Sequence, residues 1–290
     1  MLGAICLSLA ASIWGGMYVV SKYVLDFIPP LTLVWLRFIV AFVVLYAILK
    51  IAEKKQKKKI TIRKKDWLLF AWIGFIGYFI SITCQFIGTK LSDAHTGSLV
   101  TSATPAFMVI FAAIILKEKL TARRLLSTII ATIGVIIVIG WDIEIGSYFI
   151  GTIILVGAAI TWALLSIYVK IASVRFSSLV ITTYAIFFSL FFITPFMIWE
   201  LQSTYIETVN TYVILGVIYL GVVSTAGAFF LWNKGLELMD ASIGSLFFFF
   251  QPIVGSLLGW LLLNETLNSN FFIGGILIIC SVFITTFEKK

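Results

Sequence analysis

Apolar residues occur in long runs along the chain, and short polar segments separate one run from the next. A helix needs about 20 apolar residues to cross a hydrocarbon core about 30 Å thick, so each run is typical of a membrane-spanning helix. By this criterion the pattern predicts ten spans, at residues 3–23, 31–51, 67–89, 96–116, 125–141, 150–169, 179–199, 213–232, 242–263 and 271–287. The expected fold class is therefore an all-α integral membrane protein with ten transmembrane helices.

The second half of the chain repeats the first half. Without a gap, GLELMDASIGSLFFFFQPIVGSLLGWLLLNETL aligns with GTKLSDAHTGSLVTSATPAFMVIFAAIILKEKL, and the constant offset pairs Pro105 with Pro252, since 252 − 105 = 147. Five spans per half is an odd number, so the second half enters the membrane from the opposite side. We therefore expect two five-helix inverted repeats, residues 1–145 and 146–290, which can alternate around a site at the midplane.

Lysine and arginine gather on one side of the predicted membrane. With the N-terminus in the cytoplasm, the cytoplasmic segments hold eighteen of the 21 basic residues, and the outer segments hold only Lys22 and Lys90. Basic loops stay on the cytoplasmic side, so both termini are expected there. The net charge of +8 is concentrated in residues 50–65, a loop that can attract anionic lipid headgroups. This loop lacks the interleaved aromatic residues and the folded polar module of a nucleic-acid site, so no nucleic-acid partner is expected.

Two prolines lie at the middle of equivalent spans, the fourth and the ninth. Pro105 follows Thr104, and Pro252 follows Gln251. A proline inside a helix removes one backbone hydrogen bond and leaves the carbonyl four residues earlier without its partner, which in a membrane must be replaced by protein, water or ligand. The two carbonyls belong to Thr101 and Phe248. A simple packing kink is the alternative, but two kinks related by the repeat favour a role in bending helices around a cavity.

Two tryptophans lie near the centres of their spans. Trp14 and Trp162 are equivalent in the repeat, whereas tryptophan normally gathers at the membrane interfaces. Packing of Trp14 against Gly15 and Gly16 explains its position nearly as well as cavity lining does. On this basis the sequence predicts a solute cavity lined by Trp14, Tyr78, Thr101, Thr104, Trp162, Phe248 and Gln251, with Pro105 and Pro252 as the kinks.

Arg37 is the one charge deep inside a predicted span, about two turns from its start. It can extend toward the interface, pair with an acidic neighbour or meet a solute carboxylate, and the first of these is the expected outcome. Six further tryptophans lie nearer predicted span ends and are expected to anchor the helices at the interfaces. They are Trp67, Trp72, Trp141, Trp199, Trp232 and Trp260.

Several chemical signatures are missing from the sequence. No acidic residue lies at the centre of a predicted span, and the chain contains no HExxH, GxSxG or GxxxxGK[ST] motif. No catalytic residue, metal site or cofactor is therefore predicted. Two other classes stay open: a passive channel, which needs a continuous polar stripe along several spans, and a membrane-embedded enzyme, which needs reactive groups that the sequence does not offer.

Several motifs along the chain carry a family resemblance. AASIWGGMYVVSKYV and PLTLVWLRFIVAF open the first half, and each half has a helix that passes a proline and ends in KEKLT or NETLN. In this order and duplication the chain resembles the EamA family of the drug/metabolite transporter superfamily. The resemblance implies secondary transport, often export, of small metabolites such as amino acids across a bacterial or archaeal cytoplasmic membrane. It also implies that the first, third, fourth, sixth, eighth and ninth spans surround the solute.

One departure from this pattern lies beside Gln251. The residues before it are FFFF, whereas the equivalent residues of the first half are VTSA. Phenylalanine is bulkier and less polar than the residues it replaces, so we expect an asymmetric cavity with one apolar wall. Such a cavity suits a neutral or zwitterionic, partly apolar solute.

Overall fold

The computed structural model describes the whole chain except residues 57–61, 120, 140–145, 264–268 and 287–290. The described ranges are helical and contain no β-strand. The first half holds α1 (Leu2–Val24), α2 (Pro30–Gln56), α3 (Lys64–Ile73), η1 (Gly74–Ser81), α4 (Ile82–Leu91), α5 (Ala94–Thr101), α6 (Thr104–Ile115) and α7 (Ala122–Ile139). The second half holds α8 (Ser147–Ser173), α9 (Ser178–Ser203), α10 (Thr211–Ile218), η2 (Tyr219–Gly227), α11 (Ala228–Leu238), α12 (Ala241–Gly244), η3 (Ser245–Phe249), α13 (Phe250–Leu263) and α14 (Ser269–Thr286).

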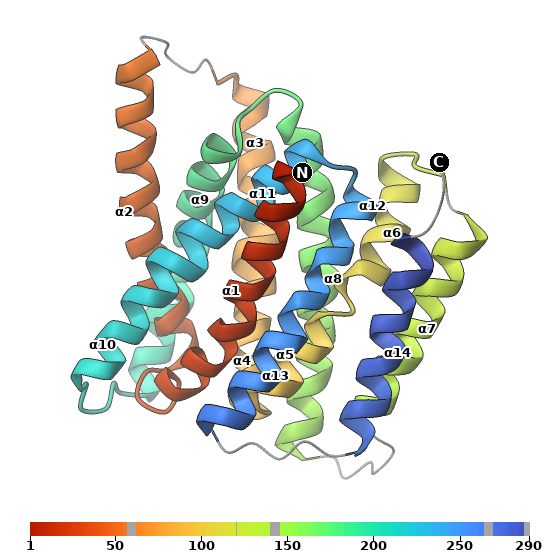
Figure 1. The fold of residues 1–290 in the computed structure, drawn as a ribbon. Helices are drawn as coiled ribbons and strands as arrows, with labels where there is room; N and C mark the ends of the chain where they lie inside the picture. The colour runs from red at the N-terminus through yellow and green to blue at the C-terminus, as the bar shows by residue number, and fades with distance from the viewer. Residues whose placement is uncertain (57–61, 120, 140–145, 264–268, 287–290) are drawn as a thin grey trace.

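Eight segments are long and apolar enough to cross a membrane, and each coincides with a predicted span. They are Leu2–Val24, Pro30–Lys55, Lys64–Leu91, Thr96–Ile115, Ser147–Ser173, Ser178–Ser203, Thr211–Leu238 and Ala241–Leu262. The fifth and tenth predicted spans correspond to α7 and α14, which pack against each other at one edge of the bundle (Figure 1). In α7 the apolar stretch is shorter, Leu125–Gly134, so a total of ten crossings stays a prediction. Trp141, Phe287 and the boundary at residue 145 lie outside the described residues.

Four of the eight segments are not continuous α-helices. The third contains the π-helix η1, and the eighth contains the π-helix η2. The fourth is broken into α5 and α6, and the ninth into α12, the 3-10 helix η3 and α13. π-Helices often occur at functional sites, and non-helical backbone at membrane depth is tolerated where it is buried or lines a cavity, so these interruptions indicate a site inside the bundle.

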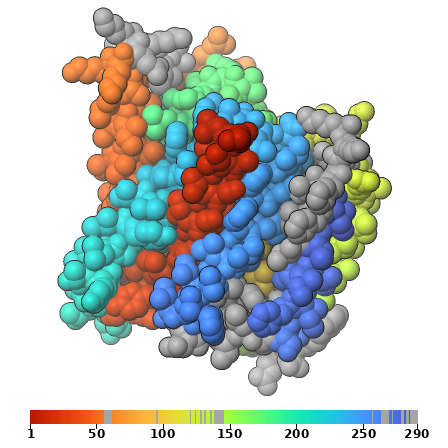
Figure 2. All heavy atoms as spheres, viewed as in Figure 1, coloured from red at the N-terminus to blue at the C-terminus, as the bar shows by residue number. Residues whose placement is uncertain are grey.

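The start of α1 and the end of α14 lie toward the same end of the bundle. In Figure 1, α1 begins at the upper end, and α14 runs from the lower end back toward the upper one. The end of α2 and the start of α3, which flank the basic loop, also lie at the upper end. In Figure 2, α1 fills the seam between α10–α11 and α12–α13, so it closes this face of the bundle.

Two lysines bind helix ends at equivalent places in the two halves. Lys22 Nζ donates to the carbonyl oxygens of Thr89 at 3.1 Å and Ser92 at 2.6 Å, at the end of α4. Lys170 Nζ donates to the carbonyl oxygens of Leu236 at 2.8 Å and Met239 at 2.7 Å, at the end of α11. The last carbonyls of a helix have no partner within the helix, so a cation placed there stabilises the end.

A buried carboxylate holds the start of α2. Glu200, at the end of α9, accepts hydrogen bonds from the backbone N–H of Leu31 at 3.0 Å and of Thr32 at 2.7 Å, and from the Thr32 hydroxyl at 2.8 Å. These N–H groups belong to the first turn of α2, where a helix leaves its donors unpaired. Glu200 thereby links α9 to α2, and its negative charge interacts favourably with the positive end of the α2 dipole.

Replacing Glu200 by glutamine is expected to lower the thermal unfolding temperature. The amide keeps one acceptor but sets an NH₂ group against a backbone donor, which costs about 1–3 kcal/mol for a buried group. Thermal unfolding of the purified protein in detergent measures the shift. Glu207→Gln changes an exposed carboxylate on the same side and serves as the control, with no shift expected. Equal unfolding temperatures for the two variants would show that the Glu200 contacts do not stabilise the bundle.

Candidate functional site

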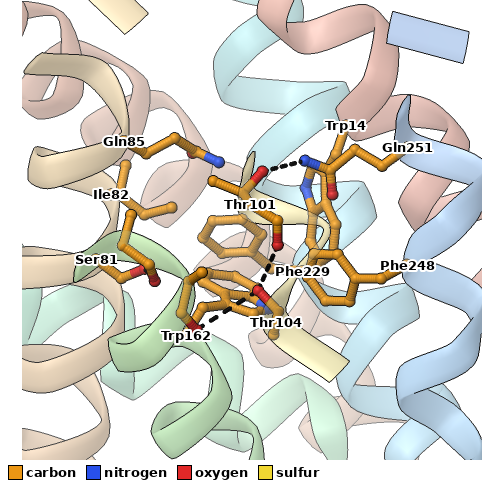
Figure 3. A pocket seen from close by; sticks show the side chains of 12 residues that line it. Trp14, Ser81, Ile82, Gln85, Thr101, Thr104, Trp162, Phe229, Phe248 and Gln251 are labelled. Atoms are coloured by element: carbon orange, nitrogen blue, oxygen red, sulfur yellow. Dashed lines mark hydrogen bonds between the residues drawn. The ribbon is translucent and has the colours of Figure 1, made fainter. Parts of the chain in front are cut away.

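A cavity lies inside the bundle, where the interrupted helices meet. The volume open to the centre of a water molecule is about 20 Å³, room for about one water, so a larger solute needs the walls to move apart. It is lined by Trp14, Ser81, Ile82, Gln85, Thr101, Thr104, Ala158, Ala159, Trp162, Phe229, Phe248 and Gln251 (Figure 3). These residues come from the first, third, fourth, sixth, eighth and ninth spans, the six that the family resemblance implies. We call this space the central cavity.

The break between α5 and α6 brings two threonines to the central cavity. Thr101 ends α5, and Thr104 and Pro105 begin α6, so the proline occupies a position where a helix needs no backbone donor. The Thr104 hydroxyl donates to the Thr101 carbonyl at 2.6 Å. Of the three replacements that the sequence allowed, protein, water or ligand, this carbonyl has the first, because the side chain before the proline replaces the missing backbone N–H.

A chain of hydrogen bonds crosses the cavity wall and joins four spans. The Thr101 hydroxyl donates to the Gly97 carbonyl at 2.7 Å, and its oxygen accepts from Gln251 Nε2 at 2.8 Å and from the Tyr18 hydroxyl at 2.6 Å. Gln85 Nε2 in turn donates to the Tyr18 oxygen. Thr101 has one proton, already given to Gly97, so Tyr18 is the donor in the bond between them. The network fixes the orientation of both glutamines.

Aromatic rings form most of the remaining wall. The centroid of the Trp14 ring lies 5.1 Å from that of Trp162, and the two ring planes are nearly perpendicular at 84°. The centroid of the Phe248 ring lies 5.7 Å from that of Trp14. The Trp162 ring lies 5.2 Å from that of Phe229. Trp14 Nε1 donates to the Ser224 carbonyl of η2 at 3.0 Å, which ties the wall to the π-helix. The Trp14–Trp162 contact is edge to face, an arrangement that aromatic rings favour, and the other two pairs are tilted.

Three polar atoms of the lining residues have no hydrogen-bond partner within the part of the chain that the structure describes. They are Gln85 Oε1, Gln251 Oε1 and Trp162 Nε1, two acceptors and one donor. Gln251 and Trp162 are 1% and 6% exposed, so water outside the bundle does not reach them freely. Leaving a buried polar group unpaired costs about 1–3 kcal/mol in proteins. These atoms are therefore suited to bind a polar group placed in the cavity.

The structure brings six of the seven predicted lining residues around one cavity. The exception is Tyr78, which stacks behind the wall on Phe229 at 4.7 Å and accepts a hydrogen bond from Asn233 at 3.0 Å. Pro105 and Pro252 are buried next to the lining residues. The remaining lining residues were not predicted from the sequence; they are Ser81, Ile82, Gln85, Ala158, Ala159 and Phe229. Of these, Gln85 gave a usable signal, because it is an amide inside an apolar run.

The two halves contribute different side chains to the cavity, and of the FFFF segment only Phe248 lines it. Its hydroxyl groups come from the first half, at Ser81, Thr101 and Thr104, while the second half contributes Phe229 and Phe248. Gln251 is the polar exception in the second half. A solute in this space thus meets a polar side and an aromatic side.

Arg37 does not extend toward the interface, and that prediction is wrong. Its side chain is fully buried, and Nε donates to the Thr225 hydroxyl at 2.7 Å. Nη2 donates to the Ser224 hydroxyl at 3.3 Å. The side chain of Arg37 stays inside the bundle because η2 offers hydroxyl acceptors at the depth of its guanidinium group.

Trp232 is not an interfacial anchor either. It is fully buried, its Nε1 donates to the Ser166 hydroxyl at 3.2 Å, and its ring lies 4.6 Å from that of Phe248. The reason is the length of the eighth span, which continues to Leu238 instead of ending at Trp232. The next residue, Asn233, is polar, and its side chain donates hydrogen bonds to the hydroxyl groups of Tyr78 and Thr182 inside the bundle.

A bundle of long apolar helices with an uncharged cavity between interrupted helices is the architecture of membrane transporters. The protein is a multi-pass membrane protein of this class. It belongs to the EamA-like transporter family, whose sequence model matches residues 1–140 and 149–287.

Individual relatives agree with this assignment. A Bacillus subtilis protein named "Uncharacterized transporter YetK" is 28% identical over 290 residues, 99% of this chain and 87% of its own length. An Escherichia coli protein named "Probable amino-acid metabolite efflux pump" is 27% identical over 292 residues, 97% of this chain and 94% of its own. A solved crystal structure superposes with a TM-score of 0.73 at 19% identity, covering 98% of this chain and 96% of the other, and shows that the fold is shared.

Proposed function

We propose that this protein is a secondary transporter that exports small neutral or zwitterionic metabolites, amino acids among them, by alternating access around the central cavity. Six spans contribute to the lining, so a relative movement of the helices can open the cavity to either side. The relative from Escherichia coli, named as an efflux pump, supports export as the direction.

The unpaired atoms of the central cavity are the observation that carries this proposal. Gln85 Oε1 and Gln251 Oε1 can accept hydrogen bonds from an ammonium group, and Trp162 Nε1 can donate one to a carboxylate. Each atom lacks a partner among the described residues, so a zwitterion replaces missing hydrogen bonds and does not have to break existing ones. The aromatic rings supply an apolar surface for a side chain.

Paired features of the two halves support the inverted repeat. The π-helices η1 and η2 occupy equivalent spans, and so do the breaks at α5–α6 and α12–α13. Lys22 and Lys170, 148 residues apart, bind helix ends in equivalent ways. In an inverted arrangement the two lysines act at opposite faces of the membrane, so each face has a lysine that holds a helix end.

We place both termini in the cytoplasm and the protein in the cytoplasmic membrane of a bacterium or archaeon. The basic loop at residues 50–65 then faces anionic headgroups, which attract lysine and arginine. Residues 57–61 of this loop lie outside the described part of the chain. Labelling of single cysteines introduced near the two chain ends tests the orientation: both must react from the same face.

Counterflow is the experiment that tests transport. Proteoliposomes loaded with one unlabelled amino acid at a time receive a trace of the same labelled compound, and transient accumulation of label is expected for at least one amino acid. Exchange that fails to saturate would indicate a passive channel. Formation of a new product without accumulation would indicate an enzyme.

A further inference from the structure

Arg37 is a buried cation held only by neutral groups. Two hydroxyl groups of η2 accept its hydrogen bonds, and its Nη1 lies 3.5 Å from the sulfur of Met17. Its Cζ lies 4.8 Å from the ring centroid of Phe86 and 5.8 Å from that of Phe229. Hydroxyl dipoles and aromatic faces stabilise a guanidinium, but they do not cancel its charge.

No carboxylate lies within 4.0 Å of Arg37 in the part of the chain that the structure describes. Guanidinium groups stay protonated in proteins, so the positive charge is permanent. Within the bundle this charge is screened far less than a charge in water. Its field therefore extends to neighbouring groups.

Arg37 and the central cavity have a common neighbour, the side chain of Phe229. Phe229, whose ring faces the guanidinium, is also a wall of the cavity (Figure 3). Ser224 joins the two places, because its hydroxyl accepts from Arg37 and its carbonyl accepts from Trp14. The twelve lining residues include no charged side chain, so no group of the wall opposes the field of Arg37.

The repeat does not supply a balancing charge. At the offsets of 147 and 148, the positions equivalent to Arg37 are Tyr184 and Ala185, and neither is charged. The second half instead places Asn233 between Tyr78 and Thr182, a neutral network. The cavity thus has a positive charge on one side only.

We propose that Arg37 is a specificity-determining residue, whose uncompensated charge makes the central cavity prefer solutes that carry a carboxylate over solutes that carry only an ammonium group. This inference rests on the proposed function and names the charge class that the same cavity selects. Arg37 acts on the solute through space and through the wall that it supports. At about 10 Å and an effective dielectric constant of about 20, one charge favours a carboxylate over a neutral group by more than about tenfold, and over an ammonium group by more than about a hundredfold.

The test compares three probes that share one side chain: leucine, the acid 4-methylpentanoate and the amine 3-methylbutylamine. Binding of each to the purified protein in detergent is measured by titration calorimetry. For the wild type we expect leucine and the acid to bind more tightly than the amine. In Arg37→Gln the affinity ratio of acid to amine is expected to fall by more than about a hundredfold, whereas Arg37→Lys, which keeps the charge, retains most of the ratio.

A second pair of variants keeps Arg37 and cancels its charge, in case Arg37→Gln does not fold. Ser224→Asp places a carboxylate beside the guanidinium and is expected to lower the ratio as Arg37→Gln does. Ser224→Asn is the neutral control of similar size and is expected to keep it. A purely structural role of Arg37 would change the affinities of all three probes together.

The outcomes separate this inference from the proposed function. A wild type that prefers the amine, or an unchanged ratio in Ser224→Asp and in folded Arg37→Gln, would overturn the inference and leave transport intact. Failure of all three probes to bind to the wild type, together with failure of every amino acid in counterflow, would overturn both.

Discussion

Replacement of Gln251 by leucine is expected to lower amino-acid exchange by at least tenfold while the protein stays folded. Gln251 donates to the Thr101 hydroxyl at 2.8 Å and keeps Oε1 unpaired at the cavity. Leucine has a similar size but offers no acceptor, so a bound ammonium group loses one hydrogen bond. A hydrogen bond to a charged group contributes about 1.5–3 kcal/mol, which corresponds to a factor of roughly ten to one hundred.

The measurement is the initial rate of counterflow at several solute concentrations, with thermal unfolding in parallel. Gln202→Leu changes an exposed glutamine at the end of α9 and is the matched control, with unchanged exchange expected. Trp14→Ala, which opens the aromatic wall, is also expected to lower exchange. If some amino acid exchanges and neither Gln251→Leu nor Trp14→Ala alters it, the solute binds elsewhere.

Substitution of Gly15 by valine is expected to prevent correct packing of α1 against α13. A Cβ atom at Gly15 would lie 2.6 Å from the Gln251 carbonyl oxygen and 2.8 Å from the Cβ of Val254. The first of these is a backbone atom, which cannot rotate away. The helices would have to separate at the point where Gln251 reaches Thr101, so folding and transport are affected together.

Gly157→Val is the control for this experiment, because a Cβ atom at Gly157 has no neighbour within 4 Å. Both variants place the same β-branched residue inside a helix, so helix propensity changes equally. The yield of monodisperse protein and its unfolding temperature are the measurements. Overpacking usually costs about 1–3 kcal/mol and costs more when the backbone itself is in the way. Similar results for both variants would show that α1 and α13 are not closely packed in the folded protein.

The eight long spans could be predicted from the sequence because length and apolar character alone define them. Which side chain faces the cavity was harder to predict in the third and eighth spans. A period of 3.6 residues locates the inner face of an α-helix, but η1 and η2 shift this period. Tyr78 lies within η1 and stacks behind the cavity wall, while Gln85 and Phe229, which the sequence did not single out, follow a π-helix. In the first and sixth spans, which are regular helices, Trp14 and Trp162 were placed at the cavity.

The errors on Arg37 and Trp232 have a different cause. Both predictions used the depth of a residue in its own span, and both residues are governed by a partner on another span. The hydroxyl groups of Ser224 and Thr225 lie 187 and 188 positions from Arg37 in the chain, and Ser166 lies 66 positions from Trp232. A single sequence gives the depth of a residue, but it does not give the neighbour that satisfies a buried donor.

The π-helix η2 gives the eighth span a way to move that needs no loop. An α-helix turns about 100° and rises 1.5 Å per residue, and a π-turn stores one extra residue relative to it. If η2 (Tyr219–Gly227) releases that residue, α11 rotates by about 100° and shifts by about 1.5 Å along its axis relative to α10. Thr225 would then turn away from Arg37, and Phe229 would leave the cavity wall. A rotation of α11 about its own axis can thus change which side chain of this helix contacts a bound solute.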